Sequence, residues 1–182
     1  MQESTRFLRK ILLRLVLVAW PVSALLAPQA VSAHAPIYLD TGSTSPDTAT
    51  PLGDPASAGL VYGTLPPGEA QYISFNISGT QPFHAMVLLP LHAGSFNPSI
   101  AIVGPGLGDA SNAPFDVPDG DGVTYVSPPA QQLPIFIADL GLRFIAGAAF
   151  DGPLGQDGSY YLVIYTPDGS GGSYTVGTGY GP

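Results

Sequence analysis

The chain has 182 residues, with 13 acidic and 5 basic residues, a net charge of −8 and no cysteine. The missing cysteines exclude disulfides and thiol nucleophiles, so the fold must stand on a hydrophobic core. The acidic balance excludes nucleic acid and anionic lipid headgroups as partners, because their phosphates would be repelled.

The N-terminus has the pattern of a cleavable export signal. A basic segment at residues 6–14 overlaps an apolar stretch at residues 11–26, which arginine and proline interrupt and which is short for a membrane span. Small side chains follow at Val31 and Ala33, the positions that a signal peptidase recognises. We expect cleavage after Ala33, with His34 as the first mature residue; the alternative is an uncleaved signal anchor.

Removal of residues 1–33 would leave a strongly acidic chain. Four of the five basic residues and one of the thirteen acidic residues lie in that segment, so the mature chain carries twelve acids, Arg143 as its one base and a net charge of −11. No later segment is long and apolar enough to span a bilayer. We therefore expect a secreted or extracytoplasmic protein, in the periplasm or at the cell surface, without stable membrane insertion after cleavage. Its expected partner is an unknown extracellular ligand or envelope protein.

Residues 34–59 are rich in proline, threonine, serine and aspartate. They predict a short strand at residues 37–39 and then an irregular lead-in that packs along the edge of a domain at residues 60–182. The sequence Asp40-Thr41-Gly42-Ser43 is similar to the loop of pepsin-type aspartic proteases, whose chemistry needs two carboxylates that share a proton. No second Asp-Thr-Gly or Asp-Ser-Gly occurs, so we expect a strand end followed by a turn.

From residue 60 onward, short apolar runs alternate with glycine, proline and aspartate, as in antiparallel strands joined by turns. The predicted strands are Leu60–Leu65, Ala70–Ile77, Phe83–Leu89, Ser99–Val103, Gly122–Val126, Ile135–Phe136, Tyr160–Tyr165 and Ser173–Gly177. The sequence therefore predicts an all-β fold, an antiparallel β-sandwich or jelly roll of about eight strands.

Two of these strands, and one segment between them, carry further patterns. In the run at residues 70–77, Tyr72, Ser74 and Asn76 alternate with apolar residues, so we expect one solvent-facing side. Residues 161–165 are apolar on both faces and predict a central strand. Residues 138–150 come nearest to a helical stripe, but their glycines argue against a long helix.

The domain resembles the pre-peptidase C-terminal type of secreted β-sandwich from Leu60 to Val176. Residues 61–75 (VYGTLPPGEAQYISF) match the opening G-x-L…G…D-x-Y-x-F of that family, and residues 96–106 (FNPSIAIVGPG) match its central strand after an x-P-x-L turn. Residues 158–165 and 171–176 match the closing G-x-Y-Y-L-x-V…G-x-Y-x-L hairpin of that family. The resemblance implies a β-sandwich with an accessory, binding or secretion-linked role and no catalysis.

The mature chain also resembles a looser group of uncharacterised exported prokaryotic proteins. The shared features are the start His-x-Pro-Ile-Tyr, here His34 to Tyr38, and the Gly-Pro-Gly turn at Gly104 to Gly106. These motifs are structural rather than chemical.

A copper site is one metal hypothesis. The α-amine and imidazole of an N-terminal His34 form a chelate for Cu²⁺, and one or two more ligands would come from elsewhere. His84 and His92 are the other histidines, but one extended strand would hold them about 26 Å apart, too far to share an ion. One of the two can still complete a site with His34. The alternative is three ordinary histidines.

A calcium loop is the other metal hypothesis. Asp116, Asp119 and Asp121 stand within six residues on a glycine-containing loop, and Ca²⁺ binds several oxygens at short range. The loop lacks the spacing of an EF-hand, and the alternative is an acidic, solvated turn.

Catalysis is the least supported function. The chain has no G-x-S-x-G elbow and no phosphate-binding glycine loop before a lysine. Sugar-binding sandwiches usually stack rings on exposed tryptophan or tyrosine; no tryptophan follows residue 33, and the nine tyrosines alone do not establish such contact. We expect a non-catalytic exported binding or accessory domain, with copper binding as the second hypothesis and an unidentified hydrolase as the third.

Overall fold

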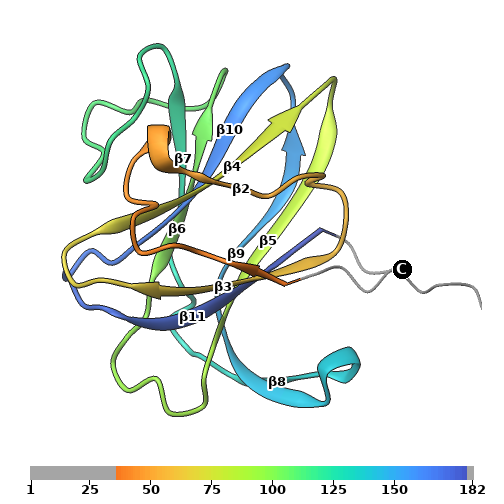
Figure 1. The fold of residues 1–182 in the computed structure, drawn as a ribbon, viewed down its shortest axis with the longest axis vertical. Helices are drawn as coiled ribbons and strands as arrows, with labels where there is room; N and C mark the ends of the chain where they lie inside the picture. Colours follow the sequence, from red (N-terminus) through yellow and green to blue (C-terminus); the bar gives the residue numbers. More distant parts are fainter. Residues whose placement is uncertain (1–35, 180–182) are drawn as a thin grey trace, which may run out of the picture. The chain divides into compact units, whose positions relative to one another are not determined.

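The computed structural model describes residues 36–179; the predicted export signal and His34 lie outside the described residues. Within this range no helix has the length and hydropathy needed to cross a membrane. The described chain is all-β, with eleven strands in two sheets that pack as a sandwich (Figure 1). The predicted fold class is confirmed.

The six-stranded sheet has the order β1 (Ile37–Tyr38), β3 (Gly59–Leu65), β11 (Gly172–Thr178), β5 (Gln81–Leu89), β9 (Leu142–Leu154) and β8 (Pro134–Ile137). The five-stranded sheet has the order β2 (Thr50–Pro51), β4 (Ala70–Ile77), β10 (Gly158–Tyr165), β6 (Ser99–Gly104) and β7 (Gly122–Val126). Two short 3₁₀ turns, η1 (Pro46–Thr48) and η2 (Ala138–Leu140), complete the described elements. Pairing is antiparallel except for β1 with β3 and β2 with β4.

The strand count of about eight was too low, and the main reason is β9. This strand covers most of the segment with the partial helical stripe, and its alanines and glycines have low strand propensity. It pairs with β5 over most of its length, with a register shift between Met86 and Leu88. A Cβ on Gly147 would lie 3.0 Å from Cβ of Val87, a tight contact, so glycine fits the close approach of the two strands. This segment therefore forms a strand because of its packing against β5, and not because of the strand propensity of its residues.

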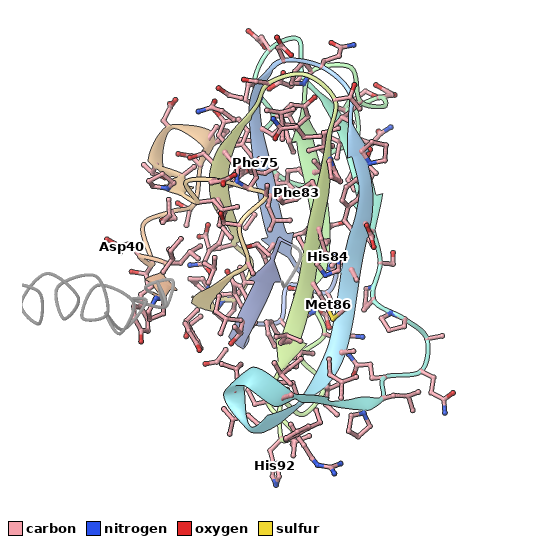
Figure 2. All side chains as sticks on the ribbon, turned by 90° about the vertical axis from the view of Figure 1, so that its right-hand side faces the viewer. Asp40, Phe75, Phe83, His84, Met86 and His92 are labelled. Atoms are coloured by element: carbon pink, nitrogen blue, oxygen red, sulfur yellow. The ribbon has the colours of Figure 1, made fainter. Side chains whose placement is uncertain are left out.

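The core lies between the sheets and is built from the inward-facing residues of neighbouring strands in both sheets. Phe75 of β4 stacks on Phe83 of β5 with ring centroids 4.3 Å apart, and on Tyr160 of β10 at 5.9 Å. Figure 2 shows Phe75 and Phe83 side by side between the sheets. Each such side chain contributes about 1.5–3 kcal/mol by burial. As predicted, β10 is a central strand, flanked by β4 and β6.

A second apolar cluster covers the outer face of the five-stranded sheet. The β6–β7 loop, residues 105–121, folds back so that Phe115 contacts Tyr72 at 6.5 Å and Tyr165 at 5.0 Å between ring centroids. The Tyr72 hydroxyl donates to the Asp116 carbonyl at 3.0 Å. Tyr72, expected on a solvent-facing side, is buried because this loop covers it.

The segment from residue 36 to residue 58 contacts both sheets. Its strand β1 pairs with β3, and its strand β2 pairs with β4. Between them the Ser43 carbonyl accepts from the Tyr72 amide at 2.8 Å, and the Ser43 hydroxyl lies 2.7 Å from that of Thr50. Figure 1 shows this segment in orange, passing along one side of the sandwich.

Candidate functional site

The two described histidines, His84 and His92, do not lie close together. His84 lies on β5, with its Nδ1 3.8 Å from Oδ2 of Asp151 on the neighbouring β9. His92 is exposed in the β5–β6 loop, and Figure 2 shows it at the end of the molecule, away from His84. His34 lies outside the described residues. The copper site therefore stays a prediction that depends on His34.

The predicted calcium loop lines a hollow of about 670 Å³ between residues 106–111 and 117–122. Asp119 and Asp121 belong to its lining, whereas Asp116 does not. Asp109, which was not predicted to lie near them, lines the hollow from residues 106–111. Burial raises the pKa of the Asp121 carboxyl above its ordinary value.

The carboxylates that line this hollow have different surroundings. Hydrogen bonds from the Ser111 hydroxyl and amide lower the pKa of Asp109 and hold its carboxylate in a local turn. Within residues 36–179, no group of three or more His, Cys, Asp or Glu side chains is placed to hold a metal ion. Calcium here would also need backbone carbonyls and water as ligands. The site stays a prediction.

The Asp40 segment is a turn, as expected. The Asp40 carboxylate accepts from the Gly42 amide at 3.1 Å, and its carbonyl accepts from the Ser43 amide at 3.1 Å. The carboxylate thus stabilises its own loop.

A different surface, which sequence reasoning did not find, crosses one end of β1, β3 and β11. It is a hollow of about 440 Å³, here called the tyrosine groove, lined by Tyr38, Leu39, Thr41, Tyr62, Gly63, Thr64, Pro90, Ser173, Tyr174 and Thr175. The rings of Tyr38 and Tyr62 stack with centroids 5.4 Å apart and planes at 23°. The Tyr38 side chain is 72% exposed, the largest exposure among the large apolar residues described.

The register of the strands builds this surface. Tyr38 is the direct partner of Tyr62, and Thr175 is the partner of Tyr62 on the other side, so the three form one row across the sheet. Val61, the neighbour of Tyr62, points into the core, so Tyr62 points outward. The alternation within β3 was visible in the sequence. The parallel pairing with β1, which brings Tyr38 to Tyr62, was not.

The inner side of the groove is closely packed. The Tyr174 ring lies where a Cβ on Gly63 would be, 2.5 Å from its Cζ, so only glycine fits there. The Tyr174 hydroxyl donates to Oε1 of Gln71 on β4 at 2.8 Å, and burial raises the pKa of Tyr174 well above its ordinary value.

The polar groups of the groove are all neutral. Its side-chain hydroxyls come from three threonines, one serine and the tyrosines, and Thr64 Oγ1 lies 3.3 Å from Ser173 Oγ. None of the lining residues is Asp, Glu, His, Lys or Arg. The Thr41 hydroxyl donates to Oδ1 of Asp40, which is not a lining residue, at 3.4 Å, and the same oxygen accepts from the Gly42 amide at 3.1 Å. The groove can stack a ring and exchange neutral hydrogen bonds.

A scan against protein-family models finds no match to this chain, and no curated protein matches it either. Among solved structures, the chain is similar to the pre-peptidase C-terminal domain of collagenase from Bacillus anthracis, known from a 1.0 Å crystal structure. The two are 19% identical with a TM-score of 0.40, and the match covers 71% of this chain and 93% of that chain. The fold described above is established by this chain's own strand order and register.

Proposed function

We propose that this chain is an exported, non-catalytic binding domain and that the tyrosine groove is its contact surface. The observation that carries the proposal is the exposed Tyr38 ring, held in place by its stack on Tyr62. Tyrosine supplies a large contact area at low entropic cost, and a ring that is already ordered loses less freedom on binding. An ordered, exposed aromatic surface of this kind favours the binding of a ligand.

The chemistry of the groove supports binding rather than turnover. Hydrolysis by a serine or threonine requires a general base within hydrogen-bonding reach of the hydroxyl. The hydroxyls of Thr64 and Ser173 have each other as neighbours, and no histidine or carboxylate joins them in the lining. The Thr41 hydroxyl has a carboxylate beside it, that of Asp40 at 3.4 Å, but this oxygen already accepts from the Gly42 amide and stabilises the local turn.

Export is part of the proposal and is supported by the signal-like pattern of residues 1–33. Because the sequence has no cysteine, the exported domain would fold without disulfides. Stabilisation by calcium at the β6–β7 loop and copper binding at His34 are kept as separate proposals, each with its own test below.

Co-sedimentation tests the proposal. The purified mature chain is mixed with insoluble envelope material from cells that produce it, and the bound fraction is measured after centrifugation. We expect the native chain to sediment, Tyr38→Ala to remain in the supernatant, and Tyr125→Ala, which changes a 43% exposed tyrosine on the other sheet, to sediment normally. A native chain that stays in the supernatant, or a Tyr38→Ala variant that sediments equally well, would refute the proposal.

A further inference from the structure

We infer that the ligand of the tyrosine groove is an uncharged carbohydrate, with one sugar ring packed against the Tyr38–Tyr62 stack. The inference rests on the proposed binding function and adds the chemical class of the ligand. Three properties of the groove lead to it: an exposed aromatic stack, a floor of hydroxyl groups and the absence of charge.

The aromatic stack fits the apolar face of a sugar ring. A pyranose presents C–H groups on one face, and these pack on the π-face of an aromatic ring, whose partial charge is negative. Tyr38 and Tyr62 stand in register on paired strands, with their planes 23° apart. Because each ring restrains the other, a ligand meets a surface that is already in place.

The hydroxyl floor fits the polar edge of the same ligand. A serine or threonine hydroxyl both donates and accepts, as a sugar hydroxyl does. Thr175 continues the row of Tyr38 and Tyr62 but is buried, at 6% exposure, whereas Thr64 and Ser173 beside it are exposed, with their hydroxyl oxygens 3.3 Å apart. Thr64 lies two residues from Tyr62 along β3, about 7 Å, so one ligand can reach both the stack and the exposed hydroxyls of Thr64 and Ser173.

The absence of charge selects against other ligands. The mature chain carries twelve acids and one base, yet no charged side chain lines this hollow. A cation would favour the acidic loops, and a polyanion would be repelled by the domain as a whole. The volume of about 440 Å³ lies within the range of about 300–1,000 Å³ for small-molecule sites.

Affinity electrophoresis provides the direct test. The mature chain is run through gels that contain dextran, laminarin, galactomannan or xylan, with anionic alginate as the charge control. We expect at least one neutral polysaccharide to retard the native chain and alginate to have no effect. Tyr38→Ala and Tyr62→Ala should weaken the interaction by about tenfold or more, because an aromatic anchor is lost.

Matched variants separate ring stacking from loss of fold. Tyr38→Phe keeps the ring and should bind within about threefold of the native chain, while Tyr125→Ala should bind as the native chain does. Ser173→Arg fills the groove from an exposed position and should abolish retardation. A thermal melt of each variant identifies any that fails to fold. Absence of retardation by every neutral polysaccharide, or retardation that Tyr38→Ala and Ser173→Arg leave unchanged, would overturn the inference.

Treatment of the envelope material separates the two proposals. Periodate cleaves sugar diols, whereas a broad protease removes protein ligands. We expect periodate to abolish co-sedimentation and protease to leave it intact. Binding that is lost with protease but survives periodate would overturn the carbohydrate assignment and leave the binding function standing. Absence of binding to the untreated material would refute both.

Discussion

The hydroxyl of Tyr174 on β11 donates a 2.8 Å hydrogen bond to Oε1 of Gln71 on β4, so a polar contact joins the two sheets inside the core. Gln71 is fully buried, and its Nε2 donates to the Asp40 carbonyl at 3.3 Å. The same pair lies beneath the tyrosine groove and connects it to the opposite sheet.

Tyr174→Phe removes the hydroxyl that donates this hydrogen bond. The buried side-chain oxygen Oε1 of Gln71 then loses its donor. We expect the free energy of unfolding to fall by about 1–3 kcal/mol, as for other buried unsatisfied acceptors. Urea denaturation measures the loss. Tyr125→Phe, at an exposed position, should change stability by less than about 0.5 kcal/mol. Equal stability of the two variants would show that the hydrogen bond contributes nothing.

Alkaline pH should destabilise the domain through its buried tyrosines. Burial, with a smaller contribution from the Asp116 charge, raises the pKa of Tyr72 to about 12, although its bond to the Asp116 carbonyl opposes the shift. The unfolded chain loses this proton near pH 10, so the folded state binds more protons between pH 10 and about 12. Stability is therefore full below pH 10 and falls as pH rises through that window.

The measurement is a series of denaturant melts at increasing pH, with Tyr72→Phe as the comparison. The variant should lose less stability over this window than the native chain. An identical pH dependence would show that Tyr72 does not contribute.

Phe115→Ala should uncover the outer face of the five-stranded sheet. Phe115 contacts the rings of Tyr72, Tyr125 and Tyr165, and truncation of a buried phenylalanine costs about 3–5 kcal/mol. Because Phe115 is only partly buried, we expect about 2 kcal/mol, together with a lower pKa for Tyr72 in an ultraviolet titration. Leu133→Ala, at a 58% exposed position, is the control. No change in the Tyr72 titration would contradict the role of the loop as its cover.

Calcium should raise the melting temperature if the β6–β7 loop binds it. At a concentration of about 100 times Kd, we expect a rise of about 5 °C in the native chain, reversed by chelator. The double variant Asp119→Asn/Asp121→Asn should show no rise, while Asp47→Asn, an exposed turn residue, should behave as the native chain does. A native melt that calcium does not move would exclude the site.

Copper binding depends on the mature N-terminus. Mass spectrometry of the exported chain should give His34 as the first residue, and copper titration should show one tight site that His34→Ala removes. His84→Ala and His92→Ala then identify a further ligand, if either histidine supplies one. A mature chain that begins elsewhere would end the hypothesis.

The strands that were predicted are those whose local pattern agrees with their packing. The limits of β4 and β7 match the predicted runs, and residues 161–165 lie on a central strand as their apolar faces indicated. β9 was not predicted, because its small residues serve close contact with β5 rather than strand propensity. The two-residue β2 carries no periodic pattern at all.

Surfaces made by distant segments were harder to predict than strands. Tyr38 meets Tyr62 through a parallel pairing that no local signal encodes, and Phe115 reaches Tyr72 because a whole loop folds back. Asp109 lines the same hollow as Asp119 and Asp121, although it comes from another part of that loop. In each case the sequence shows the residue type but not its neighbour.

The segment before β3 has a consequence for solubility. Its strands β1 and β2 occupy the outer edges of β3 and β4, so one stretch of chain shields an edge of each sheet from other molecules. Unprotected edges offer unpaired amides and carbonyls to any passing strand. A chain that began at Gly59 would keep most of its core but would self-associate edge to edge, and the lead-in is therefore this domain's own protection against aggregation.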